Sequence, residues 1–177
     1  MRSTLAKERG QSVPDMMCDV LLEENLEVGF KAVPPFDQGE TLEQINKDTL
    51  ELLSRPYYMV GSDAIPLGES PHPRAFGTFP RLLRFSREYN FKMEKLINRM
   101  TKVPADRFGL TDRGSLEIGK AADIVVFDAE TVTDTATYRQ PRSGAKGICH
   151  VLVNGQVAVR DERATGTFAG KALERLD

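Results

Sequence analysis

The sequence contains no tryptophan and only two histidines, His72 and His150, so few residues can support catalysis by imidazole. Its two cysteines, Cys18 and Cys149, stand far apart without a Cys-x-x-Cys pair, which favours free thiols in a reducing compartment. The formal net charge is -2 and no long basic run occurs, which argues against nucleic-acid binding. Residues 1–10 show no apolar signal segment, and no apolar run is long enough to span a membrane. We therefore expect a soluble cytoplasmic protein without nucleic-acid or membrane partners.

The chain has enough apolar residues to bury a core, because 40% of its 177 residues are hydrophobic. Helices alternate with short apolar strands over residues 1–102, a pattern typical of βα units around a parallel sheet. Pro14 suits a first helical turn, Thr41 with Gln44 fits a capping box, and Asn90 fits an N-cap. The predicted helices cover 3–9, segments beginning at Pro14 and at Thr41, 79–89 and 91–102, and the predicted strands cover 28–33 and 57–60.

The pattern changes after Pro104, where glycines punctuate short segments. The apolar runs 124–127 and 151–153 favour strands. Asn154-Gly155 lies between two such runs and is a strong signal for a hairpin turn. We therefore expect a small antiparallel β unit in this part of the chain.

Residues 60–81, VGSDAIPLGESPHPRAFGTFPR, combine several features of an active-site loop. A short apolar run ends at a lone acid, Asp63, and a loop rich in Pro, Gly and Ser leads to a His-Pro-Arg triplet. Catalytic residues of βα barrels lie where strands end, so Asp63 is a candidate catalytic residue. The alternatives are a turn-capping aspartate at 63, a hydrogen-bonding loop histidine at His72 and a surface arginine at Arg74.

Three segments resemble the C-terminal part of D-aminoacylases, which are N-acyl-D-amino-acid deacylases of the amidohydrolase superfamily. They read SDA…HPRAFGTFPRLLRFSRE, MTKVPADRFGLTDRGSLEIGKAADIVVFD and ATYRQPRSGAKGICHVLVNGQVAVRD. The stretch His72–Arg81 is the most specific to these deacylases, whereas Gly119–Ile124 is shared widely across the superfamily. The resemblance implies an α/β fold, the C-terminal portion of a (β/α)8 amidohydrolase barrel followed by a small antiparallel β unit.

The same resemblance implies a division of the chain into three parts. Residues 1–109 would be a partial barrel segment that includes the last barrel strand, 57–62, and the active-site loop. Residues 110–165 would form the C-terminal half of a β domain. Residues 166–177 would be a tail.

The resemblance also implies roles for the loop residues. Asp63 matches an aspartate beside a zinc-bound water, so it would accept the water's proton and deliver it to the departing amine. Arg74 matches a residue that binds the carboxylate of the N-acyl-D-amino acid, which a planar guanidinium grips with two hydrogen bonds. His72 lies on the same loop and is a weaker substrate-binding candidate.

Most zinc ligands of such enzymes are absent from this sequence. A catalytic zinc takes about three protein ligands, mostly His and Cys. The family draws them from a His-x-His pair, a Cys and further His residues on earlier strands, and no His-x-His occurs here. Asp63 alone remains as a metal-site candidate. We therefore expect the chain to bind no catalytic zinc tightly and to lack deacylase activity by itself.

Three interpretations stay open. The chain is a C-terminal fragment of a zinc-dependent hydrolase acting on linear amides, or one subunit of a split deacylase, or a non-catalytic remnant with an interaction or scaffold role. A partial barrel exposes strand edges, which promote association. We therefore expect self-association or an N-terminal barrel segment as the partner, and a small N-acyl amino acid as the substrate of a completed site.

Overall fold

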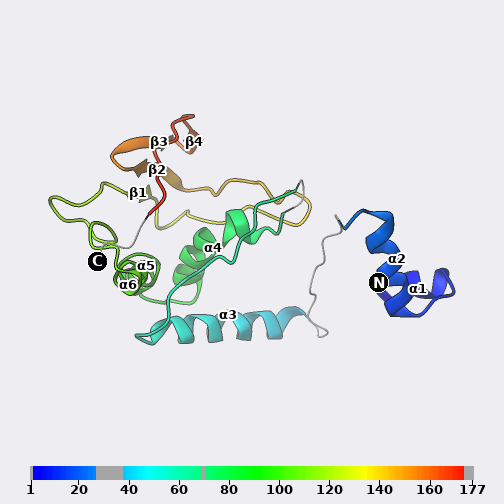
Figure 1. The fold of residues 1–177 in the computed structure, drawn as a ribbon. Helices are drawn as coiled ribbons and strands as arrows, with labels where there is room; N and C mark the ends of the chain where they lie inside the picture. Colours follow the sequence, from blue (N-terminus) through cyan, green and yellow to red (C-terminus); the bar gives the residue numbers. More distant parts are fainter. Residues whose placement is uncertain (1, 27–37, 69–70, 174–177) are drawn as a thin grey trace.

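The computed structural model describes residues 2–26, 38–68 and 71–173. These residues form six helices and a four-stranded antiparallel sheet, which is a mixed α/β architecture (Figure 1). None of the described helices is long and apolar enough to cross a lipid bilayer. The helices are α1 (Arg2–Glu8), α2 (Val13–Glu23), α3 (Gln38–Ser54), α4 (Arg74–Glu88), α5 (Met93–Met100) and α6 (Lys102–Phe108), and the strands are β1 (Ile124–Phe127), β2 (Ile148–Val153), β3 (Gln156–Arg160) and β4 (Arg163–Ala164).

The N-terminal helices α1 and α2 pack against each other and lie apart from the other elements in Figure 1. The Ser12 hydroxyl accepts a hydrogen bond from the backbone N–H of Asp15 and so caps α2. Pro14 occupies the first turn of α2, as the sequence predicts. Met16 of α2 is buried, so the two helices share a small apolar contact.

Two helix-capping signals predicted from the sequence are wrong. α3 begins before Thr41, so Thr41 and Gln44 lie inside the helix and do not form a capping box at its start. α5 has Lys92 at its N-cap, whereas Asn90 adopts a left-handed φ of 51° just after α4 ends. Asparagine tolerates this left-handed conformation better than most residues. Asn90 therefore follows the end of α4 and does not cap the start of α5.

A hydrophobic core joins helices α3, α4 and α5 to the segment after β1. Leu96 of α5 and Val132 are fully buried within it, and burial of such side chains contributes about 1.5–3 kcal/mol each. Arg99 of α5 secures the end of α3, because its Nε donates to the Leu53 carbonyl at 3.1 Å. The buried core residues are Leu50, Leu53, Leu82, Leu83, Phe85, Leu96 and Val132.

The described residues do not form the strand predicted over 57–60. Residues 58–67 have no regular secondary structure, and Tyr57 is 91% exposed. The backbone N–H of Val60 donates to the Arg99 carbonyl at 3.1 Å, a contact with a helix residue and not with a strand. A parallel strand needs a hydrogen-bonding neighbour, and the described part of the chain holds no parallel strand pair. The strand predicted over 28–33 lies outside the described residues.

The antiparallel sheet expected from the sequence is confirmed, with strand order β1-β2-β3-β4. Asn154 and Gly155 join β2 to β3 in a two-residue turn in which both residues have positive φ, 48° and 78°. This conformation matches the right-handed twist of the two strands, which explains why Asn-Gly is favoured there. The strand predicted over 151–153 begins earlier, at Ile148.

The β1–β2 connection, residues 128–147, runs from the sheet along α4 (Figure 1). Its Asp134 carboxylate binds Arg81 at 2.8 Å and Arg84 at 3.1 Å. Arg87 Nη1 donates to two backbone carbonyls of the same connection. Three arginines of α4 therefore fix the β1–β2 connection against the helix and bring it close to the loop that precedes α4.

Candidate functional site

The loop before α4 brings the predicted site residues into one connected group. Asp63 Oδ2 lies 2.9 Å from Arg74 Nη1. Arg74 is the first residue of α4, which therefore begins earlier than the helix predicted over 79–89. The backbone N–H of Arg74 donates to His72 Nδ1 at 3.1 Å. Because Pro73 at the N-cap makes no side-chain cap, the imidazole satisfies one of the free N–H groups at the helix start.

The Asp63–Arg74 ion pair is open to solvent. The Asp63 side chain is 88% exposed and the Arg74 side chain 42%. Asp63 also has a left-handed φ of 48°, which directs the chain around the turn at this point. Exposed ion pairs contribute only about 0–1 kcal/mol, so the carboxylate of a ligand can replace Asp63 on Arg74 at small cost.

His72 is held from both ring nitrogens. Its Nε2 lies 2.8 Å from the hydroxyl of Tyr138, in the β1–β2 connection. Partial desolvation lowers the pKa of His72, although the residue is exposed, and the charges of Arg74 and Arg81 lower this pKa further. The imidazole is therefore kept neutral around pH 7. Sequence reasoning did not single out Tyr138, and its only signal was its place in the segment ATYRQPRSGAKG that resembles deacylases.

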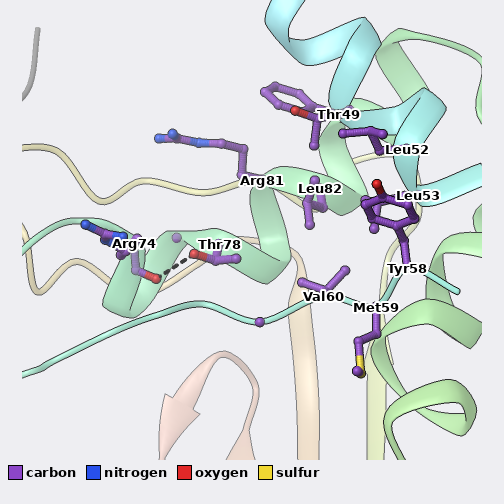
Figure 2. Close-up of a pocket in the computed structure, with 13 residues that line it drawn as sticks. Thr49, Leu52, Leu53, Tyr58, Met59, Val60, Arg74, Thr78, Arg81 and Leu82 are labelled. Carbon is purple, nitrogen blue, oxygen red and sulfur yellow. Dashed lines mark hydrogen bonds between the residues drawn. The ribbon is translucent and has the colours of Figure 1, made fainter. Parts of the chain in front are cut away.

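A cavity of about 360 Å³ lies between α3, α4 and the extended segment before the loop (Figure 2). Arg74, Thr78 and Arg81 line it from one face of α4, spaced four and three residues apart, as helical periodicity requires. The Thr78 hydroxyl donates to the Arg74 carbonyl at 2.8 Å. The rest of the lining is mainly apolar, with Leu53 and Tyr58 among its residues. The cavity is thus an apolar hollow at whose margin Arg74 and Arg81 turn their guanidinium groups outward, toward Asp63 and Asp134.

A larger cavity of about 910 Å³ lies between the helices α4 to α6 and the strands β1 and β2. Its lining is mainly apolar and includes Phe79, Leu83 and Ile97 on the helix side and Val125 and Val151 on the strand side. Asp63, His72 and Arg74 do not line it. This cavity is an apolar groove and carries no candidate catalytic group from the sequence analysis.

The residues present do not fit a zinc site. Over residues 2–26, 38–68 and 71–173, no group of three or more His, Cys, Asp and Glu side chains is placed to hold a metal ion. Asp63 is paired with a guanidinium, a neighbour that repels a cation. Cys18 lies exposed on α2, and Cys149 and His150 lie in β2. The structure therefore does not bring these residues together with Asp63.

The fold and loop match one protein family. The chain belongs to the amidohydrolase family, because the model of that family matches residues 24–159. Within that family it is D-aminoacylase-like. It is 45% identical over 130 residues to the D-aminoacylase of Alcaligenes xylosoxydans xylosoxydans, a match that covers 72% of this chain and 27% of that enzyme. It is 52% identical over 119 residues to the N-acyl-D-glutamate deacylase of the same organism, covering 66% of this chain and 24% of that enzyme.

Solved structures agree with this assignment. A structure of D-aminoacylase, a protein described with a binuclear metal center, superposes with a TM-score of 0.76 at 37% identity and covers 98% of this chain and 34% of that chain. The N-acyl-D-glutamate deacylase of Bordetella bronchiseptica, in complex with zinc and a phosphonate inhibitor, gives a TM-score of 0.68 at 32% identity, over 92% of this chain and 33% of that one. The chain thus spans about a quarter of the curated relatives and a third of these structures, which is consistent with a C-terminal part of such a protein.

Proposed function

We propose that this chain supplies one side of the active site of an N-acyl-D-amino-acid deacylase. Arg74 is the anchor for the substrate carboxylate, and Asp63 is the residue that moves the proton. The observation that carries this proposal is the 2.9 Å contact between Asp63 on the loop and Arg74 at the start of α4, because it places an acid beside a carboxylate-binding group. The two relatives at 45% and 52% identity, which are deacylases of D-amino-acid derivatives, support it.

The proposal includes a division of the chain. Residues 1–109 belong to the barrel portion, in which 57–62 would become the last strand once a complementary segment supplies its neighbours, residues 110–165 to the β unit, and 166–177 to a tail. The exposure of Tyr57 and the lack of regular secondary structure over residues 58–67 support this assignment. A barrel strand is covered by a neighbour on each side, so it is left bare when those neighbours lie outside the described residues.

Substrate binding begins with an exchange of partners on Arg74. Two parallel N–H groups of its guanidinium bind the substrate carboxylate, which displaces Asp63. Asp63 then accepts a proton from the attacking water as the water oxygen bonds to the acyl carbon. When the amide C–N bond breaks, Asp63 returns this proton to the nitrogen, which leaves as the amine. The products are a carboxylic acid and a D-amino acid.

The described residues do not fit a metal site, so no step here is assigned to a metal. A zinc such as the one in the Bordetella bronchiseptica structure would need ligands from outside the described chain. We propose that the chain alone turns over no substrate and that a complementary barrel segment restores turnover. A subunit of a split deacylase is the second candidate, favoured by the apolar groove of about 910 Å³ that a partner segment can cover.

The test measures amine release from N-acetyl-D-amino acids and bound zinc, first with the chain alone and then with an added N-terminal segment of a D-aminoacylase. We expect amine release only with the added segment, and loss of that release in Asp63→Asn. Asp161→Asn is the matched control, because Asp161 is also exposed but lies in the turn before β4. Turnover by the chain alone, or Asp63→Asn with full activity, would contradict the proposal. A chain that stays inert with every segment added would favour a scaffold role.

A further inference from the structure

The β1–β2 connection holds the candidate site loop at two points. Tyr138 contacts His72 through its hydroxyl, and the two rings meet edge to face with centroids 5.1 Å apart. Arg142 Nη2 donates to the backbone carbonyl of Gly68 at 2.6 Å. His72 and Tyr138 are 66 positions apart in the sequence, and Gly68 and Arg142 are 74 positions apart. The loop is thus shaped by a distant segment as well as by its own sequence.

The hydrogen bonds of His72 fix the position of its proton. Nδ1 accepts the backbone N–H of Arg74, so Nδ1 is unprotonated. A neutral imidazole then carries its proton on Nε2, and this N–H donates to the Tyr138 hydroxyl oxygen at 2.8 Å. The lowered pKa of His72 keeps the ring in this neutral form. The Arg74 N–H, which can only donate, therefore selects this tautomer, and the Tyr138 hydroxyl holds the ring in place by accepting from Nε2–H.

His72 accepts the backbone N–H of Arg74, which is the proposed anchor for the substrate carboxylate. Arg74 begins α4, and its guanidinium reaches back to Asp63 across the loop. Pro71 and Pro73 are both buried on either side of His72, and their rings fix two backbone φ angles. A shift at the start of α4 therefore moves the Arg74 guanidinium relative to Asp63.

We propose that Tyr138 is a positioning residue of the candidate site. Acting through His72, it fixes the start of α4 and thereby the direction of Arg74. The inference rests on the proposed function for the role of Arg74 as the carboxylate anchor. It goes further by making a residue of the β1–β2 connection part of that site.

The first test is a nitrogen-15 NMR measurement of the His72 ring in the full chain. We expect a protonated Nε2 and an unprotonated Nδ1 at about pH 7.5, where an ordinary histidine is already mostly neutral. A ring protonated on Nδ1 would overturn the proposal, because such a ring cannot accept the Arg74 N–H. This measurement requires no variant and therefore does not depend on how a variant folds.

The second test compares hydrogen exchange at the Arg74 backbone amide in four variants. His72→Asn places an amide oxygen near the Nδ1 position and should keep exchange within about twofold, whereas His72→Gln should accelerate it by about five- to tenfold, the effect of one lost hydrogen bond. Tyr138→Phe should accelerate it as well and shift the nitrogen-15 resonance of His72 Nε2, because Nε2–H loses its acceptor. Tyr57→Phe, at an exposed tyrosine, is the matched control and should change neither.

The outcomes separate this proposal from the proposed function. If Tyr138→Phe behaves like Tyr57→Phe in both measurements, Tyr138 does not position Arg74 and the inference is wrong. Neither readout needs substrate turnover. A completed barrel that releases no amine would therefore contradict the deacylase proposal and leave the link from Tyr138 to the Arg74 amide standing.

Discussion

Arg81 Nη2 lies 2.8 Å from Asp134 Oδ2, although the two residues are 53 positions apart in the chain. The Asp134 side chain is only 7% exposed, and its other oxygen lies 3.1 Å from Arg84 Nε. Arg84 also binds Glu88, one turn further along α4. A buried carboxylate held by two arginines therefore ties the β1–β2 connection to the helix that begins the candidate site.

Removing the Asp134 carboxylate should loosen this attachment. In Asp134→Asn both arginines lose a charged partner, but Arg81 is half exposed and water can solvate it. We therefore expect a decrease of about 1–3 kcal/mol in the free energy of unfolding, typical for a lost charge-assisted hydrogen bond. Urea denaturation followed by circular dichroism measures it. Asp161→Asn, at an exposed position, is the control and should stay within about 0.5 kcal/mol of the wild type.

Gly147 is required where the β1–β2 connection turns back into β2. Its φ is +76°, and a Cβ at this position would lie 2.7 Å from the backbone of Val132, which is fully buried. Gly147→Ala must move this backbone, so we expect the free energy of unfolding to fall by more than about 2 kcal/mol. This total exceeds the roughly 1–2 kcal/mol that left-handed strain alone would cost.

Gly119→Ala separates these two contributions. Gly119 also has a positive φ, +91°, but no atom lies within 4 Å of an added Cβ. Its substitution should therefore cost only the backbone strain, about 1–2 kcal/mol. Equal losses of stability in the two variants, measured by urea denaturation, would show that the close approach of Gly147 to Val132 is not tight.

Local signals in the sequence predicted some features correctly, and contacts between distant segments decided the others. Asn154-Gly155 specifies its turn through its own backbone preferences, so the hairpin was predictable. Asp63 and Arg74 stand close together in the sequence, so their contact across the loop before α4 follows from a short motif. The strand predicted over 57–60 needs partners that the described chain lacks, and no periodicity reveals that. Tyr138 was not predicted because its contact with His72 arises only in the folded chain.

The Asp63–Arg74 pair should contribute little to stability. Both side chains are open to water, so their attraction is screened and each is solvated when the other is removed. A double-mutant cycle with Asp63→Asn and Arg74→Gln should therefore give a coupling energy below about 1 kcal/mol in urea denaturation. A coupling above about 2 kcal/mol would identify the pair as structural and contradict the proposed exchange of partners on Arg74.

The stability of the chain should depend on the protonation of His72. Partial desolvation, followed by the charges of Arg74 and Arg81, lowers the pKa of His72 in the folded state below the unfolded value of about 6.5. As pH falls, the unfolded chain therefore binds the proton first. The stability contributed by the neutral ring is present above about pH 6.5 and is lost as pH falls through the lowered folded pKa.

This dependence can be measured by urea denaturation between about pH 7.5 and about pH 5, the range in which histidine titrates. The free energy of unfolding of the wild type should decrease more over this range than that of His72→Asn, whose amide does not titrate. His150→Asn removes the other histidine but leaves the Arg74 N–H bound to His72, so it serves as the control for the loss of an imidazole elsewhere in the chain. Parallel curves for wild type and His72→Asn would mean that protonation of His72 leaves the start of α4 unchanged.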